Sequence, residues 1–541
     1  MNQQAETNKG VLGKIGLTMS GGGYRAAAFH LGSLDYLDQV GLISQLIMLS
    51  TVSGGSFIGA KYALALAYKT PFNEFFRDSY IITRDTPLVK MAIEELGNGK
   101  LETPSGRRDL IIAMSQVYNK TFLKTADGKP ALFGTILNAD IPLQEIVINS
   151  TEFKYGLGFR FQRSLNSNAK IGNGKISIPR NAAAEISLSD IVAASSCFPG
   201  GYEPFAFPDD FTWSNNKVPQ AIRDIFPKPL ALMDGGVYDN QGIESLLLAD
   251  DRNANDLDMF IISDSSQETQ DIYPFPEEKN DDKLTLGGID LISRLIYFLC
   301  AISALAVGYQ VWDKYQSGSF KIFWDFFLYL IPLVLSGIGA GAIWWLRDTI
   351  YKKILPQIPQ IGRDSWNDFK KLTVSDLAQM VNLRITSLFA MANDVFMNRV
   401  RALVYRIIYT DDRYNKKRIS NLIYHLKSDE IFSPLLDKLP QIKKPTPQLR
   451  AVVDAAANMP TALWFDYDYQ LPCLVACGHA TLCYNLMKHT VRLYGNKPAE
   501  YPDQVKLLWN KLVSDWNIMV EDPYALIRMR LPDVPLSMPP V

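Results

Sequence analysis

Four short apolar runs between residues 11 and 270 constrain the fold most, because each has the length and composition of a buried strand. They are Ile15–Met19, Leu46–Val52, Leu230–Met233 and Met259–Ser263. Helical patterns separate the runs, and strands that alternate with helices indicate an α/β layered fold. Each run leads into glycine, serine or aspartate, which suits strand ends that open onto a site. The sequence therefore predicts an α/β domain over residues 11–270.

Two longer apolar runs follow this domain. Leu295–Trp312 has 18 residues without a charge, Phe326–Leu346 has 21, and thirteen residues join them. As helices they would reach roughly 27 and 31 Å, close to the hydrocarbon thickness of a bilayer. A pair of buried core helices is the alternative, but two adjacent runs of this length favour an inserted transmembrane helical hairpin over residues 291–350.

The flanking charges predict an orientation for the hairpin. Lys and Arg number three before it, four after it and two in the connecting loop. This bias predicts a multi-pass membrane protein with two spanning helices and both large regions on the cytoplasmic side. Residues 351–541 form a helical C-terminal region by their apolar spacing. The basic residues Arg384, Arg399, Arg401 and Arg406 are interpreted as its solvated face, with contact to anionic lipid as the alternative.

Composition excludes several classes of function. A formal net charge of −1 argues against a nucleic-acid partner, and five cysteines in 541 residues do not make a disulfide framework. Cys473, Cys477 and His479 have a spacing that could hold zinc. Their flanks are apolar, however, and no second ligand pair follows at finger spacing. We therefore expect no metal and no cofactor, and nothing in the composition indicates an oligomeric state.

The segment Ser20–Arg25 places Gly21, Gly22 and Gly23 between a strand and a helical run. Such a loop leaves amide groups uncovered at a helix N-terminus, where a developing anion is stabilised. The same letters also satisfy the dinucleotide fingerprint G-x-G-x-x-G/A. That alternative requires an acidic residue at the end of the second strand, and residues 41–52 contain none.

Ser53 ends the second strand and is followed by Gly54, Gly55 and a helical stretch. A serine in a sharp turn between strand and helix is the geometry of a nucleophile elbow. Ser56 remains a weaker alternative nucleophile, because Ser-Gly-Gly-Ser by itself is more often an ordinary turn.

Asp234 ends the third strand and is followed by two glycines, which clear space beside its carboxylate. A serine nucleophile needs a base within hydrogen-bond reach, and a carboxylate at a neighbouring strand end can supply it. None of the four histidines lies in the sequence context of a triad base: they are His30, His425, His479 and His489.

These motifs, in this order, resemble those of the patatin-like phospholipases. The glycine loop resembles the family's oxyanion loop, Ser53 its elbow serine and Asp234 the aspartate of its D-G-G/A motif, while residues 194–204 resemble its A-S-x-A-x-P block. The likeness covers residues 11–270. The sequence departs from the family pattern at three positions: Thr51 replaces the elbow's first glycine, Ala26 a glycine after the arginine, and Gly242 a proline after the aspartate motif. The departure at Thr51 puts the conformation of the elbow in question.

The resemblance implies a patatin-like three-layer αβα catalytic core and a Ser–Asp dyad acting on carboxylic esters. Ser53 would be the nucleophile, Asp234 the base, and the amides of Gly21–Gly23 the oxyanion hole. Arg25 would position the glycine loop or contact a lipid phosphate. The expected substrates are membrane glycerophospholipids or lysophospholipids. Acyl transfer or thioester hydrolysis on the same fold, and a catalytically vestigial membrane scaffold, are the alternatives.

Overall fold

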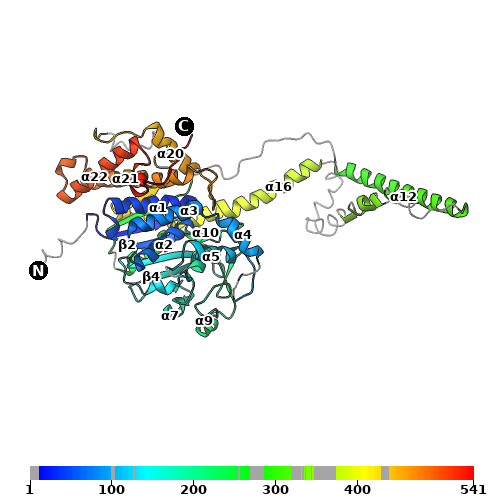
Figure 1. The fold of residues 1–541 in the computed structure, drawn as a ribbon, viewed down its shortest axis with the longest axis horizontal. Helices are drawn as coiled ribbons and strands as arrows, with labels where there is room; N and C mark the ends of the chain where they lie inside the picture. The colour runs from blue at the N-terminus through cyan, green and yellow to red at the C-terminus, as the bar shows by residue number, and fades with distance from the viewer. Residues whose placement is uncertain are drawn as a thin grey trace. The chain divides into compact units, whose positions relative to one another are not determined.

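The fold is described from a computed structural model of the chain (Figure 1). The structure describes residues 11–267, 285–318, 373–427 and 438–540, together with separate positions between 331 and 345. Within the first range it leaves out 99–100, 102–103, 126–127 and 254–255. The chain divides into two compact units. The first combines Met1–Gln270 with Phe396–Val541, and the second is Asp271–Val395.

The strands of the first unit are β1 (Ile15–Met19), β2 (Leu46–Val52), β3 (Glu145–Glu152), β4 (Leu157–Ser164), β5 (Ile171–Gly172), β6 (Ser177–Ile178), β7 (Phe205–Phe207), β8 (Leu230–Asp234), β9 (Met259–Asp264) and β10 (Arg418–Leu422).

The described helices before residue 260 are α1 (Gly23–Gln39), α2 (Gly54–Ala67), α3 (Phe72–Asp85), α4 (Leu88–Gly97), α5 (Leu110–Thr121), α6 (Phe133–Leu137), α7 (Arg180–Ala183), α8 (Leu188–Ser196), α9 (Gln220–Ile225), α10 (Gly236–Asp239) and α11 (Ile243–Arg252). Those after it are α12 (Leu286–Gln316), α16 (Val374–Ala390), a π-helical segment (Met391–Phe396), α17 (Met397–Thr410), α18 (Asp412–Asn415), α20 (Pro447–Asn458), α21 (Gln470–Tyr494), α22 (Asp503–Glu521) and α23 (Ala525–Arg530).

The strands of the described residues form one ten-stranded mixed sheet in the order β10-β9-β1-β2-β3-β4-β5-β6, with β8 paired to β3 and β7 to β8. Strands β10, β9, β1, β2 and β3 run parallel to one another, whereas β3 pairs antiparallel with β4 and β8. The parallel strands β1, β2 and β9 therefore end at one edge, where Ser20, Ser53 and Ser265 follow them. The four apolar runs predicted as strands are β1, β2, β8 and β9.

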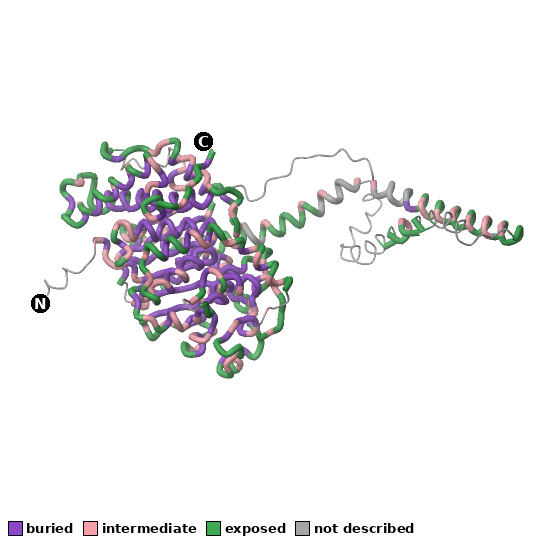
Figure 2. Tube along the Cα trace, in the orientation of Figure 1, coloured by how far each residue is buried: buried purple, intermediate pink, exposed green. Residues whose placement is uncertain are grey.

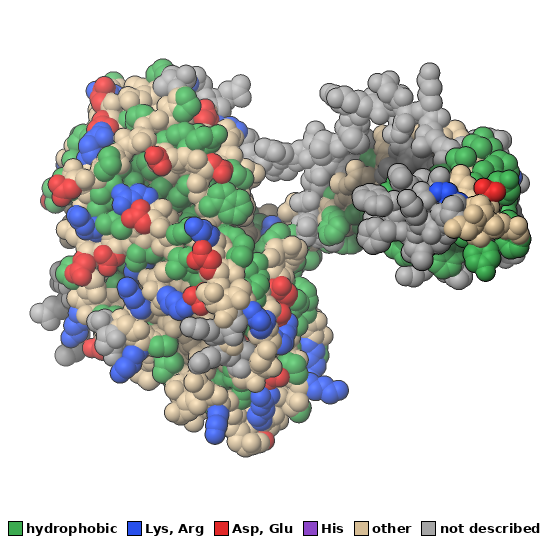
Figure 3. All heavy atoms as spheres, turned by 45° about the vertical axis from the view of Figure 1, so that its right-hand side comes forward, with side chains coloured by type: hydrophobic (Ala, Val, Ile, Leu, Met, Phe, Trp, Pro, Cys, Tyr) green, Lys and Arg blue, Asp and Glu red, His purple; other side chains and the backbone are tan. Residues whose placement is uncertain are grey.

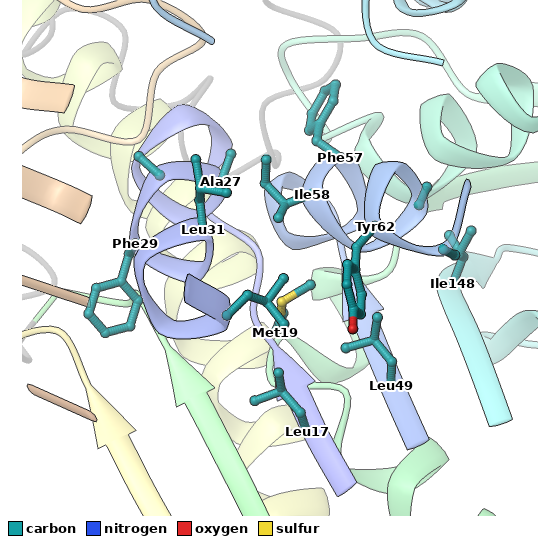
Figure 4. Close-up of a cluster of buried hydrophobic side chains, with 14 of the residues drawn as sticks. Leu17, Met19, Ala27, Phe29, Leu31, Leu49, Phe57, Ile58, Tyr62 and Ile148 are labelled. Atoms are coloured by element: carbon teal, nitrogen blue, oxygen red, sulfur yellow. The ribbon is translucent and has the colours of Figure 1, made fainter. Parts of the chain in front are cut away.

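Helices cover both faces of the sheet, as expected for a three-layer core. Leu17, Met19 and Leu49 point from the strands toward Leu31 and Ile58 on α1 and α2 (Figure 4). On the opposite face a second apolar cluster joins alternate strand residues to helices α11 and α17. Burial is concentrated in these layers (Figure 2). The α/β three-layer arrangement is the architecture that the alternating pattern predicted.

The region after residue 396 completes this core. Strand β10 pairs in parallel with β9 at one end of the sheet, and α21 packs along α1 (Figure 1). The two helices approach closely at two glycines: a Cβ on Gly32 would lie 2.1 Å from the carbonyl oxygen of Val475, and one on Gly478 would lie 2.3 Å from that of Phe29. The sequence predicts separate regions over 11–270 and 351–541, whereas Phe396–Val541 belongs to the same compact unit as Met1–Gln270.

Among the described residues of the second unit, one helix is long and apolar enough to cross a membrane: Ser293–Gln316, with a mean hydropathy of 1.7 and none of its window buried. Hydrophobic side chains gather on the visible surface of this unit (Figure 3). The second expected span, Phe326–Leu346, lies largely outside the described residues. One span is therefore supported by length and composition, and the hairpin as a whole is not.

Candidate active site

Strand β3 brings Ser53 and Asp234 together. Val52, the last residue of β2, pairs with Asn149 of β3. The next residue of β3, Ser150, pairs with Asp234, the last residue of β8, which runs in the opposite direction. The two strands thus meet end to end along one edge of β3. The Ser53 side chain directly follows β2, and its hydrogen-bonding interaction with the Asp234 carboxylate lowers the pKa of Asp234.

Ser53 has the backbone of a strained elbow, with φ 49° and ψ −119°. Positive φ is costly for a non-glycine residue and persists where the surroundings impose it. Here the Ser53 amide donates to the hydroxyl of Ser195 at 3.0 Å, and that hydroxyl donates to the carbonyl oxygen of Asn149 at 2.6 Å. Helix α2 starts at the next residue, so the chain turns sharply between strand and helix.

Thr51 does not prevent the elbow from forming. Its hydroxyl donates to the carbonyl oxygen of Val147 at 3.2 Å, which holds the side chain against β3. Its methyl group lies only 2.4 Å from where a Cβ on Gly59 would stand, so the space for Thr51 depends on that glycine in α2. The missing first glycine of the motif is therefore accommodated by a glycine elsewhere.

Ser56 faces away from the catalytic carboxylate. Its hydroxyl lies 3.0 Å from the Thr51 hydroxyl and 2.9 Å from that of Ser195, and the residue is completely buried. Ser53 is 8% exposed. Of the two serines, Ser53 is the one whose side chain acts on the Asp234 carboxylate.

The Asp234 carboxylate is buried and held from several sides. The Gly236 amide donates to its Oδ1 at 2.7 Å, and interactions with the Ser53 side chain and with the Arg401 charge favour the ionised form. These interactions lower the pKa, but burial raises it more strongly, and the pKa of Asp234 rises from 3.8 to about 6. A carboxylate with this pKa is mostly ionised at neutral pH and is a stronger base than an exposed aspartate.

The glycine loop lies directly against Ser53. A Cβ on Gly21 would stand 3.0 Å from the Cβ of Ser53, and Gly22 and Gly23 have φ values of 147° and 59°, which favour glycine. The Gly21 amide donates to the carbonyl oxygen of Asn240 at 3.1 Å. The Gly22 and Gly23 amides have no backbone acceptor among the described residues. Of the three expected oxyanion donors, two amides are thus available.

Arg25 is buried and takes a structural position. Its Nη1 donates to the carbonyl oxygen of Met459 at 2.7 Å. The adjacent Tyr24 amide donates to the carbonyl oxygen of Ala462 at 2.8 Å. Both acceptors lie between α20 and α21, so this segment holds the glycine loop at the start of α1. The geometry favours loop positioning over lipid-phosphate contact for Arg25.

Each of the four histidines has a ring nitrogen in contact with a group other than Ser53 or Asp234. His30 Nδ1 lies 3.0 Å from the Ser263 hydroxyl, His479 Nε2 lies 2.8 Å from Asp35, His425 contacts Asn485, and His489 contacts Arg492. Burial lowers the pKa of His30 and His425 to about 4. The residues of the zinc alternative lie on α21, where the Cys473 thiol contacts Tyr524 and the Cys477 thiol contacts the carbonyl oxygen of Ile423.

Three residues of the site were not identified from the sequence as functional. Ser195 holds the Ser53 amide, and Asn240 accepts from the Gly21 amide. Arg401 donates from Nε to the carbonyl oxygen of Gly236 at 2.7 Å. Ser195 lies in the A-S-x-A-x-P block and Asn240 follows the aspartate motif, so their neighbourhood gave a signal. Arg401 had none, because it was interpreted as part of a solvated helix face.

Comparison with known proteins agrees with this geometry. Residues 17–247 match the family model described as patatin-like phospholipase, a range that contains the glycine loop, Ser53 and Asp234. None of the curated protein sequences matches the chain. Members of the matched family are hydrolases of lipid acyl esters. Over residues 17–247 the chain is therefore similar to the patatin-like phospholipases.

Proposed function

We propose that the protein is a membrane-associated lipid acyl hydrolase of the phospholipase A or lysophospholipase type, with Ser53 as nucleophile and Asp234 as general base. The observation that carries this proposal is the end-to-end meeting of β2 and β8 on β3, which brings the strained Ser53 elbow beside Asp234. Activation of a serine requires such a base in contact with its hydroxyl.

In the proposed acylation step, the Ser53 proton moves to the Asp234 carboxylate as Oγ attacks the ester carbonyl. The Gly22 and Gly23 amides stabilise the negative charge on the carbonyl oxygen of the tetrahedral intermediate. Collapse of this intermediate expels the alcohol product, which takes the proton from Asp234, and leaves an acyl group on Ser53.

Deacylation repeats the same transfers with water. Asp234 accepts a proton from the attacking water and returns it to Ser53 Oγ as the acyl bond breaks. No step requires a metal or cofactor.

Matched serine variants test this assignment. Ser53→Ala is expected to abolish ester hydrolysis and labelling by a serine-reactive fluorophosphonate. Ser56→Ala is the control, because the Ser56 hydroxyl contacts Thr51 and Ser195 rather than Asp234, and it is expected to keep much of both. Folded wild-type protein that neither hydrolyses any lipid ester nor takes the label would instead support a catalytically vestigial scaffold.

Membrane association is the second part of the proposal. Helix α12 carries exposed apolar side chains such as Leu305 (74%) and Trp312 (63%), which supports burial in lipid. We propose that residues 291–350 form a two-helix anchor with the catalytic unit on the cytoplasmic side. An anchor would keep the enzyme at its substrate surface and so raise the local substrate concentration.

Fractionation and tagging test the anchor. The protein is expected to sediment with membranes and to resist extraction by high salt, which screens purely electrostatic attachment. Tags at Met1 and in residues 313–325 are expected to be accessible from opposite sides of the membrane. Solubility without detergent would contradict the anchor, and accessibility of both tags from one side would contradict the two spans.

A further inference from the structure

Helix α17 presents one face to the catalytic unit and another to its surroundings. Ile408 is buried, and Tyr405 and Tyr409 are partly buried beside it. Phe396, just before the helix, and Leu403 are more than half exposed, at 57% and 56%. Arg401 is partly buried and makes a specific contact with the aspartate turn. Its position on the helix therefore differs from that of a solvated basic residue.

The contact joins Arg401 to Asp234 through a single residue, Gly236. Arg401 Nε donates to the carbonyl oxygen of Gly236 at 2.7 Å, and the Gly236 amide donates to Asp234 Oδ1 at 2.7 Å. A Cβ on Gly236 would stand 3.0 Å from that same Oδ1, so residue 236 lies tightly against the carboxylate. A shift of this residue would move the donor that orients Asp234.

We propose that Arg401 is a positioning residue for Asp234, which fixes Gly236 beside the carboxylate and favours its ionised form. The inference rests on the proposed function, in which Asp234 is the general base. It assigns a part of the catalytic machinery to helix α17, which lies outside residues 17–247 of the family match.

The electrostatics agree with this role. The groups that act on the Asp234 carboxylate are the Ser53 hydroxyl, the Gly236 amide and the Arg401 charge, all of which lower its pKa. The neighbouring Cys197 thiol is kept neutral, because burial and the Asp234 charge raise its pKa. Arg401 is thus the cation among the described groups that offsets the burial of Asp234. Its loss would raise the pKa of Asp234 above about 6.

The pH dependence of kcat/KM tests the proposal, because it reports the pKa of the base in the free enzyme. Full-length wild type, Arg401→Gln and Arg401→Lys are compared on a soluble short-chain ester in one detergent between pH 5 and 9. In Arg401→Gln the acidic limb is expected to move to higher pH. The loss at pH 5.5 should then exceed the loss at pH 8.5 by at least about threefold.

Two further variants complete the comparison. Arg401→Lys retains the charge and is expected to return the acidic limb toward the wild-type position. Arg406→Gln removes an exposed arginine from the same helix and is expected to leave the profile unchanged. Arg401→Met keeps the apolar stem of the side chain and replaces the glutamine variant if that variant does not fold.

If folded Arg401→Gln or Arg401→Met loses the same factor in kcat/KM at every pH, Arg401 has a merely structural role and the proposal is overturned. A pH profile of kcat/KM identical to that of wild type would overturn it as well. Asp234→Asn separates this failure from that of the proposed function. If Asp234→Asn is inactive while the acidic limb of Arg401→Gln stays in place, the inference about Arg401 alone fails. If Asp234→Asn retains wild-type turnover, the dyad itself fails.

Discussion

The crossing of α1 and α21 offers a substitution for which helix propensity and packing predict opposite signs. Gly478 lies inside α21, and replacing a helical glycine by alanine favours an isolated helix by about 1 kcal/mol. In the fold, however, the new Cβ would lie 2.3 Å from the carbonyl oxygen of Phe29, 3.0 Å from the Ser33 amide nitrogen and 3.1 Å from the Gly32 Cα.

All three neighbours of this Cβ are backbone atoms, so no side-chain rotation can relieve the overlap. The helices must separate, and overpacking of a buried contact costs about 1–3 kcal/mol. With three close contacts we expect a cost near the upper end, which leaves Gly478→Ala about 2 kcal/mol less stable than wild type after the propensity gain. Because α1 begins in the glycine loop, hydrolytic activity should fall as well.

Urea unfolding followed by tryptophan fluorescence measures this effect, since Trp509 and Trp516 are buried in the adjacent α22. Gly97→Ala is the control: Gly97 ends α4, and a Cβ there would meet nothing within 4 Å. It should match or slightly exceed wild type. A Gly478→Ala variant as stable as wild type, or more stable, would refute the close crossing and with it the integration of α21 into the catalytic unit.

Three further outcomes follow from the buried carboxyl groups. The pKa of Asp234 is raised to about 6, so its ionised fraction drops about tenfold from pH 7 to pH 5. The kcat/KM of the wild type should fall by the same factor. A kcat/KM that stays constant over this range would contradict the role of Asp234 as base. Asp234→Asn should lower turnover by about 10²–10⁴-fold, whereas folded His479→Gln should lower it far less. If steady-state assays give the two variants equal losses of turnover, the Ser53–Asp234 dyad is contradicted. Burial raises the pKa of Asp190 to about 7. Between about pH 4 and pH 7 the native state therefore holds a proton on Asp190 that the unfolded state releases. The stability that this bound proton gives the native state is lost as pH rises through that range. Asp190→Asn should therefore show a smaller loss of stability between pH 4.5 and 7.5 in thermal unfolding, and an undiminished loss would show that Asp190 does not titrate in this way.

The features readable from the sequence were those whose physical cause lies within a short segment. An apolar run followed by Ser53 and two glycines describes strand, turn and helix in consecutive residues, so local propensity suffices to predict the elbow. The same holds for the strand before Asp234 and for the apolar composition of α12. The sequence also excluded a dinucleotide site, because the acidic residue that it requires would have stood at a known distance along the chain.

Other features depended on contacts between distant segments. No local pattern indicates that β2 and β8 meet end to end on β3, which is what brings Ser53 beside Asp234. Gly59 makes room for Thr51, a compensation that a motif comparison would count as a mismatch. Arg401 has the sequence context of a solvated helix residue, and its role follows from the contact of α17 with α10.

The domain boundary shows the same division. Helical spacing predicted the helices after residue 365 but could not show that β10 joins the sheet or that α21 packs on α1. Strand pairing and helix crossing depend on which surfaces meet, and those surfaces are separated here by hundreds of residues, as Phe29 and Gly478 are. The sequence by itself thus predicted the candidate motifs and the strand, turn and helix that carry them. Tertiary structure decided which groups surround the dyad, because hydrogen bonds, burial and charge act through space rather than along the chain.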